Sequence, residues 1–121
     1  MNESGKAVSS LARFYKISPQ NCVICFDDVS LDLGKLRIRK NGSAGGQKGM
    51  KSVIEQLGTQ DIPRLRVGIG PKPEKFDLVN FVLGKFSAQE ETVLAPALTR
   101  AVEALETLFT AGVEKAMNQF N

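Results

Sequence analysis

A glycine-dense segment carrying lysines is the part of this chain best suited to bind an anion. Residues 42–51 read Gly-Ser-Ala-Gly-Gly-Gln-Lys-Gly-Met-Lys, and a helical pattern of apolar residues follows. Glycines let a backbone approach a ligand closely, and the first turn of a helix presents unpaired N–H groups and a partial positive charge. A glycine-rich connection alone is more often just a tight turn. The segment therefore indicates a phosphate site only together with its neighbours.

Charge is arranged unevenly around this loop. The acidic segment before it contains Asp27, Asp28 and Asp32, whereas the basic residues that follow are Lys35, Arg37, Arg39, Lys40, Lys48 and Lys51. A basic strand and loop beside carboxylates is the layout expected where a phosphate chain is held near an acid. Taken alone, the first two aspartates are more often solvated loop carboxylates than catalytic groups.

Composition is that of an ordinary globular protein. The chain has 121 residues, 42% of them hydrophobic and 24% charged, with a net charge of +3. We expect one domain over residues 1–121, and the mild basic excess is compatible with nucleic acid. No apolar stretch is long enough to span a membrane and no secretory signal pattern begins the chain, so we expect a cytoplasmic protein without a membrane partner.

The two cysteines, Cys22 and Cys25, stand in a C-x-x-C arrangement. Cysteines at this spacing on a strand point to opposite faces and cannot readily join. The chain has no histidine and no second cysteine pair to complete a zinc site. We interpret both as buried structural thiols, which fits a reducing compartment, and expect no metal.

Helical and strand patterns alternate along the chain. Helices are predicted over residues 4–16 with Ser4 as N-cap, over 47–57 with Gly58 as the stop, from Ser87 to Gly112 with a Glu90 capping box, and over 113–120; strands are predicted over 22–26, 35–40 and 65–70. Pro96 is expected to displace the start of the long helix. The fold class is therefore α/β, a single domain with a mixed twisted sheet flanked by helices.

Several blocks of residues together resemble a known family. They are Met-Asn at residues 1–2 followed by Ser-Gly-Lys at 4–6, Arg-Leu-Arg-Val-Gly-Ile-Gly at 64–70, Phe-Val-Leu-Gly-Lys-Phe at 81–86 and Ala-Met-Asn-Gln-Phe-Asn at 116–121. With the acidic segment, basic strand and glycine-rich loop, they are similar to the C-terminal portion of bacterial-type peptidyl-tRNA hydrolases. In that family a first strand, a Gly-x-Gly-Asn-Pro-Gly turn and the catalytic histidine precede the Met-Asn block. The resemblance implies that this chain is N-terminally truncated and inactive alone.

The resemblance also implies roles for individual residues. Asp27 matches the aspartate that orients and charges the catalytic histidine, and Asn2 matches an asparagine that contacts substrate through its amide. Arg39 and Arg66 match two basic positions that clamp a terminal phosphate of tRNA. Without the match, both arginines would be interpreted as an exposed strand face.

The glycine-rich loop is expected to contact substrate through Gly45, Gly46, Gln47 and Lys48. The family usually has a histidine and an asparagine where Gln47 and Lys48 stand. Glutamine can hydrogen-bond but cannot titrate, and lysine adds a fixed positive charge without an acceptor. We expect this change to tune substrate access or phosphate binding.

The implied reaction is hydrolysis of the ester in peptidyl-tRNA, without metal or other cofactor, releasing tRNA and peptide for reuse in translation. The expected partner is peptidyl-tRNA, and the expected assembly is a monomer. Two alternatives stay open: a non-catalytic RNA-binding protein on the same scaffold, and an inactive truncated product.

Overall fold

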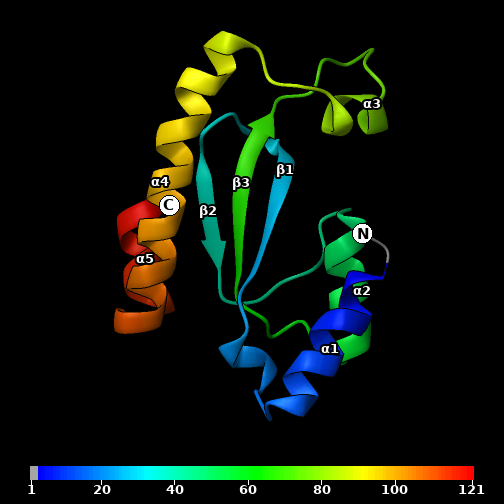
Figure 1. Ribbon diagram of the computed structural model, residues 1–121, viewed down its shortest axis with the longest axis vertical. Helices are drawn as coiled ribbons and strands as arrows, with labels where there is room; N and C mark the ends of the chain where they lie inside the picture. Colours follow the sequence, from blue (N-terminus) through cyan, green and yellow to red (C-terminus); the bar gives the residue numbers. More distant parts are fainter. Residues whose placement is uncertain (1–2) are drawn as a thin grey trace. The chain divides into compact units, whose positions relative to one another are not determined.

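The computed structural model describes residues 3–121, which form two compact units. Of the described residues, one unit takes 3–26 and 39–65 and the other takes 27–38 and 66–121. The elements are α1 (Ser4–Phe14), η1 (Pro19–Asn21), β1 (Ile24–Asp32), β2 (Leu36–Arg39), α2 (Lys48–Leu57), β3 (Arg64–Gly70), α3 (Leu78–Leu83), α4 (Ala88–Ala111) and α5 (Val113–Phe120) (Figure 1). The α/β class is confirmed, while the single domain over residues 1–121 stays a prediction.

The three strands form one sheet in the order β1-β3-β2. β1 and β3 run in the same direction and β2 runs opposite to them (Figure 1). The predicted mixed sheet is therefore confirmed. Each strand contributes residues to both units, because the unit boundaries fall within the strands.

Two glycines of β3 allow another part of the chain to cross directly over the strand. A Cβ atom on Gly68 would overlap the carbonyl oxygen of Asp32, and one on Gly70 would overlap that of Val29. The Leu33 N–H donates to the Gly70 carbonyl at 2.8 Å at the same crossing. Because glycine carries no side chain, the end of β1 can pass across β3 and reach the side where β2 begins.

A bulge then sets the register between β2 and β3. The Gly34 N–H donates to the Gly68 carbonyl at 3.1 Å, and the Gly68 N–H donates to the Lys35 carbonyl at 2.7 Å. Gly34 and Lys35 thus lie opposite the single residue Gly68. Gly34 takes the left-handed conformation (φ 86°) that this type of bulge requires. Continuing the antiparallel ladder places Arg37 opposite Arg66, with both side chains on one face.

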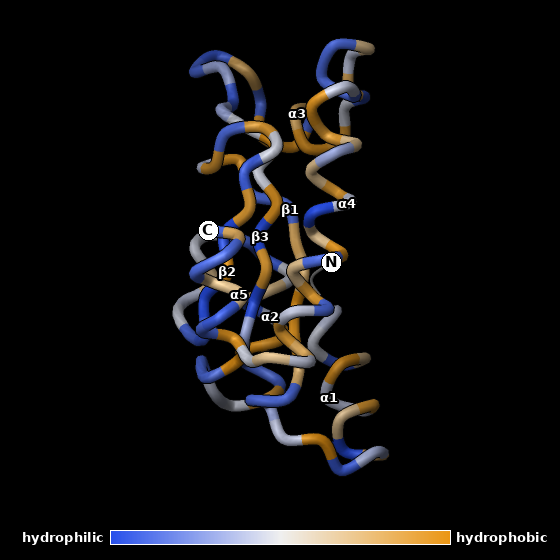
Figure 2. The backbone as a smooth tube through the Cα atoms, turned by 90° about the vertical axis from the view of Figure 1, so that its left-hand side faces the viewer, coloured by the Kyte–Doolittle hydropathy of each residue, from blue (hydrophilic) through white to orange (hydrophobic). Residues whose placement is uncertain are grey.

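In the first unit, α1 packs closely against α2. The Gly5 N–H donates to the Ser52 hydroxyl at 3.0 Å, and a Cβ atom on Gly5 would overlap the Ser52 carbonyl. Hydrophobic and hydrophilic segments both occur along α1 (Figure 2), and its buried residues Gly5, Ser9 and Ala12 recur at the spacing of one helix face. The core of this unit is built on Met50, Val53 and Ile62, each at most 1% exposed.

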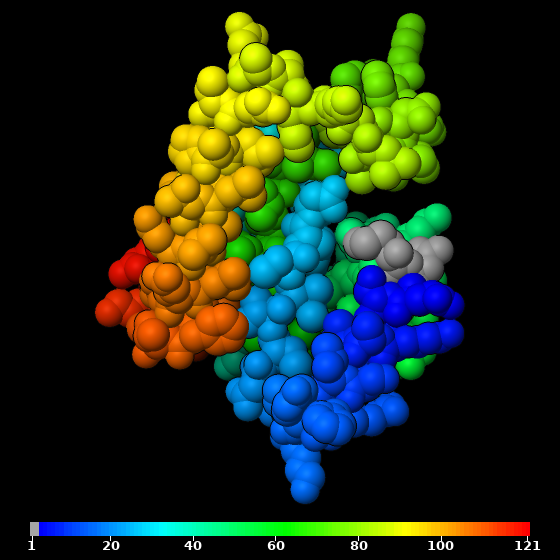
Figure 3. Space-filling view, viewed as in Figure 1, coloured from blue at the N-terminus to red at the C-terminus, as the bar shows by residue number. Residues whose placement is uncertain are grey.

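In the second unit, α4 buries a row of small residues and one leucine, namely Ala97, Ala101, Ala104 and Leu108. Its other side stays open: Leu98, Val102 and Phe109 are 49%, 57% and 67% exposed. Much of α4 accordingly lies at the surface in the space-filling view, from yellow to orange (Figure 3).

The outer edge of β2 is closed by a side chain from the end of the described chain. The Ile38 N–H donates to the Asn121 side-chain oxygen at 2.6 Å, and the Asn121 amide nitrogen donates to the Ile38 carbonyl at 3.0 Å. The carboxamide therefore pairs with the strand as a neighbouring peptide group would.

The first strand differs from its prediction. β1 runs to Asp32, so Asp27, Asp28 and Asp32 lie in a strand and not in an acidic loop. Intervening Val29 and Leu31 favour a strand, and pairing with β3 overrides the low strand propensity of aspartate. Cys25 lies in β1 but is exposed, so its predicted burial is wrong, and both cysteines are free thiols.

Other boundaries also shift. α1 begins at Ser4, so the prediction of Ser4 as its N-cap is wrong; Glu3 takes that position and its side chain makes no cap hydrogen bond. Pro96 lies inside α4 without displacing its start, because the Ser87–Glu90 capping box fixes the helix from residue 88. α3, capped by Asp77, was not expected at all. The predicted β2, α2, β3 and α5 are confirmed within two residues.

We predict that Gly68→Ala lowers the free energy of unfolding by about 2–3 kcal/mol, because the added methyl group overlaps a backbone carbonyl that cannot move independently. Chemical denaturation followed by circular dichroism measures this change. Gly46→Ala is the control, since open space surrounds that position and only its φ of 85° is strained, a loss of about 1 kcal/mol. Equal losses in both variants would contradict the crossing as the cause.

Candidate nucleic-acid interface

The glycine-rich loop before α2 is open on its outer side. Gly45 and Gly46 have φ angles of 59° and 85°, in the left-handed region that favours glycine. A Cβ atom at either position would find no heavy atom of residues 3–121 within 4 Å. The peptide groups here are consequently accessible to a ligand.

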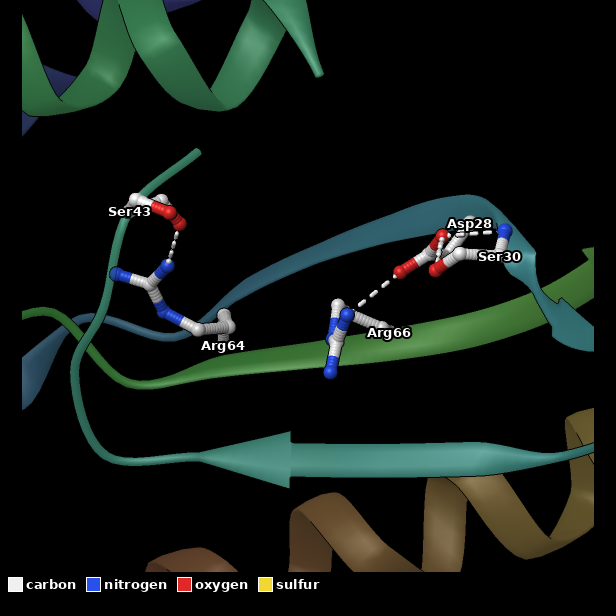
Figure 4. Close-up of polar contacts among 5 residues, drawn as sticks. All are labelled: Asp28, Ser30, Ser43, Arg64 and Arg66. Atoms are coloured by element: carbon white, nitrogen blue, oxygen red, sulfur yellow. Dashed lines mark hydrogen bonds and ion pairs between the residues drawn. The ribbon is translucent and has the colours of Figure 1, made fainter. Parts of the chain in front are cut away.

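Arg64 fixes the beginning of this loop. Its guanidinium is bonded through Nη1 to the Ser43 carbonyl at 2.7 Å, through Nε to the Ile62 carbonyl at 2.9 Å and through Nη2 to the Gln60 carbonyl at 3.1 Å. The residue is 3% exposed. Arg64 is therefore a structural arginine, each of whose three nitrogens donates to a backbone carbonyl, and Figure 4 shows its contact with Ser43.

Gln47 fixes the other end of the loop. Its side-chain oxygen accepts a hydrogen bond from the Met50 N–H at 2.8 Å, which makes it the N-cap of α2. Lys48 opens the helix and is exposed. The four predicted loop residues, Gly45, Gly46, Gln47 and Lys48, thus lie together at a helix N-terminus, where an anion is favoured.

In the second unit, Asp28 of β1 pairs with Arg66 of β3. Arg66 Nη1 lies 2.7 Å from Asp28 Oδ2, and the two side chains are 26% and 14% exposed (Figure 4). The other carboxylate oxygen accepts hydrogen bonds from the Ser30 N–H at 2.7 Å and the Ser30 hydroxyl at 2.6 Å. Burial acts to raise the pKa of Asp28, but the hydrogen bonds from Ser30 and Arg66, together with the charge of Arg66, hold it below its usual value.

Arg66 differs from Arg64 in what its nitrogens contact. Among the described residues, its only hydrogen bond is to Asp28, and its buried Nε has no acceptor. A buried donor without a partner is unfavourable, and structural arginines avoid it. The buried Nε is out of reach of a ligand, but the side chain is 26% exposed, so its other nitrogens retain donors for a further acceptor.

The predicted site residues are only partly brought together. Asp27 lies in β1, and because neighbouring side chains of a strand point to opposite sides, it does not share the Asp28–Arg66 pair. Arg39 ends β2, where the register places it opposite Arg64. Arg39 and Arg66 belong to different units, so their predicted joint clamp stays a prediction. Asn2 lies outside the described residues.

The roles of Asp28, Ser30 and Arg64 were not predicted from the sequence. The consecutive aspartates could have indicated two roles, because adjacent side chains of a strand point to opposite sides. Nothing in the sequence predicts that Arg64 bonds three backbone carbonyls whereas Arg66 bonds only Asp28 among the described residues.

Within residues 3–121, no three or more His, Cys, Asp or Glu side chains lie close enough to hold a metal ion. None of the helices in this same range is long and apolar enough to cross a bilayer.

We predict that Asp28 stabilises the fold in a pH-dependent way. Because its pKa is lowered on folding, the stabilisation is complete above the unfolded value of about 3.9 and is lost as the pH falls from there through the folded pKa. Asp28→Asn should lower the free energy of unfolding by about 1–2 kcal/mol at pH 7 and by much less near pH 2–3. Urea denaturation at several pH values measures both proteins; a constant difference would contradict the ion pair.

A family model described as peptidyl-tRNA hydrolase matches residues 1–121. The peptidyl-tRNA hydrolases of Elusimicrobium minutum and Thermotoga maritima are 59% and 53% identical over 121 residues, which is 100% of this chain and 65% of each relative. A crystal structure of peptidyl-tRNA hydrolase from Acinetobacter baumannii matches with a TM-score of 0.91 at 31% identity, covering 100% of this chain and 61% of that one. The chain thus spans less than two thirds of the length of these relatives. It belongs to the peptidyl-tRNA hydrolase family.

Proposed function

We propose that this chain holds the tRNA part of a peptidyl-tRNA substrate, and that the reaction it serves is hydrolysis of the ester joining peptide to tRNA. The observation that carries this proposal is the guanidinium of Arg66, a fixed cation that is 26% exposed and bonds only Asp28 among the described residues, so that donors other than the buried Nε are left for a phosphate oxygen. Contacts of this kind position RNA without reading its sequence.

The glycine-rich loop would supply a second contact. The open backbone at Gly45 and Gly46 and the exposed Lys48 stand at the beginning of α2. A helix N-terminus with accessible N–H groups suits a phosphate or a developing oxyanion. Gln47 supports this site by capping the helix, and its amide N–H groups remain as donors. Asn2 is proposed as a further substrate contact on the family resemblance alone.

Asp27 would supply the catalytic support. Ester hydrolysis needs an activated water, and a histidine held by a carboxylate is a common general base. The chain contains no histidine, so in this proposal the histidine that acts as general base comes from outside these 121 residues. Asp27 is the carboxylate not engaged by Arg66, and we assign it to that histidine.

The absence of histidine also favours a second candidate function, a non-catalytic RNA-binding protein on the same scaffold. Both candidates require tRNA binding through Arg39 and Arg66. Only the hydrolase requires Asp27, so a substitution at Asp27 distinguishes the two candidates.

Arg66→Ala should weaken tRNA binding equally for different tRNA sequences and flatten the log–log salt dependence by about one counterion. Arg39→Ala should do the same. Fluorescence anisotropy at several salt concentrations measures both. Arg13→Ala, an exposed arginine near the end of α1, is the charge-matched control. An unchanged salt slope with lower affinity would mean that the variant has lost structure instead of a phosphate contact.

The 121-residue chain alone should hydrolyse peptidyl-tRNA at least about 100-fold more slowly than a full-length relative, because general-base assistance is worth ~10²–10⁴-fold. Fusing the N-terminal third of the Thermotoga maritima relative should restore activity. In that fusion, Asp27→Asn should lower kcat more than it raises KM, since Asp27 would act on charge in the transition state. Full activity of the Asn variant would remove Asp27 from the mechanism, and full activity of the unfused chain would overturn the need for a histidine.

A further inference from the structure

We propose that Asp28 is a positioning residue, which holds one side of the Arg66 guanidinium so that its remaining donors meet a tRNA phosphate. This inference rests on the proposed function, because it assumes that Arg66 contacts the RNA. It adds a residue that has no counterpart among the site residues inferred from the sequence.

The carboxylate of Asp28 is itself held in one orientation. Ser30 donates to Oδ1 twice, from its backbone N–H at 2.7 Å and from its hydroxyl at 2.6 Å, so Oδ2 is left to face Arg66. The Oδ2 to Nη1 distance of 2.7 Å is that of a strong charge-assisted bond. Both side chains are mostly buried, unlike the exposed Lys6–Glu3 and Lys51–Glu55 pairs. Asp28 is therefore a rigid partner.

The guanidinium keeps donors after this bond is made. Arg carries five N–H groups in a planar fork, and Asp28 engages only one nitrogen of Arg66. Because 26% of the side chain is exposed, a second anion can reach the donors that Asp28 leaves unused. A lysine could not divide its contacts in this way, because its ammonium is a point charge without a planar fork.

Neighbouring charge explains why a carboxylate is needed here. The register places Arg37 directly opposite Arg66 on the same face, and within residues 3–121 no carboxylate forms a salt bridge with Arg37. Like charges directly opposite on a sheet repel. Asp28, on the far side of Arg66, offsets that repulsion in the free protein and keeps the guanidinium extended across the sheet.

Asp28 acts on phosphate binding in two opposite ways. Its charge repels a phosphate, but this repulsion is reduced because the carboxylate is already paired with Arg66 and hydrogen-bonded by Ser30. Its bond removes the rotamer freedom that Arg66 would otherwise lose on binding, and this freedom is large for arginine. We expect the second effect to prevail, so that removing Asp28 weakens binding although it removes a negative charge.

The test compares two acceptor-stem RNA hairpins that differ only in a 5′-phosphate or a 5′-hydroxyl group. The 121-residue chain and its variants are titrated with each hairpin by fluorescence anisotropy. Asp28→Ala should bind the phosphorylated hairpin about threefold to tenfold more weakly, the range for one immobilised side chain. It should bind the hydroxyl hairpin as the parent does, and the salt slope should stay unchanged because Arg66 keeps its charge.

A double-mutant cycle tests whether the effect passes through Arg66. Asp28→Ala combined with Arg66→Ala should bind no more weakly than Arg66→Ala alone. Ser30→Ala removes one of the two bonds that orient Asp28, so it should weaken binding of the phosphorylated hairpin in the same direction but less than Asp28→Ala. Asp28→Glu, which can restore the ion pair, should recover part of the loss and covers the case in which Asp28→Ala fails to fold.

The outcomes separate the inference from the function on which it rests. If the parent chain does not distinguish the two hairpins, the phosphate contact and the inference both fall. If the parent distinguishes them and Asp28→Ala binds equally well or more tightly, only the inference falls, and Asp28 is a competing anion. Additive losses in the cycle would likewise overturn the positioning role.

Discussion

The close crossing of the chain over Gly68 and Gly70 is the constraint on which the second unit depends. It brings the end of β1 into contact with β3 without any side chain between them. The same crossing delivers the chain to the bulge at Gly34, from which the register of β2 follows. The positions of Asp28 beside Arg66 and of Arg37 opposite Arg66 therefore depend on the glycines at 68 and 70.

Consecutive aspartates in an extended strand can serve two separate purposes. Asp28 is committed to Arg66 and Ser30, whereas Asp27 faces the other side of β1 and is free of that pair. An acidic loop, as expected from the sequence, would not have separated them so cleanly. The extended conformation commits one carboxylate to the ion pair with Arg66 and leaves the other free of it.

Local signals made most helices predictable, and non-local contacts made the first strand difficult. The Ser87–Glu90 capping box and Gly58 act within one turn of the residues they mark, so α2 and α4 could be predicted from the sequence. The three aspartates of β1 argue against a strand locally, and only pairing with β3 reverses this. Likewise, Arg64 and Arg66 have the same sequence context, and only the backbone carbonyls around Arg64 tell them apart.

Anchoring of the glycine-rich loop has a thermodynamic consequence. Arg64 holds the loop at Ser43, and Gln47 is committed to the cap of α2, so little more than Gly45 and Gly46 stays free of side-chain neighbours. Ordering the backbone of one residue costs about 1–2 kcal/mol, and glycine is at the upper end. Binding of a ligand at this loop would therefore have to order only a few peptide units, and the entropic cost of that ordering would be correspondingly small.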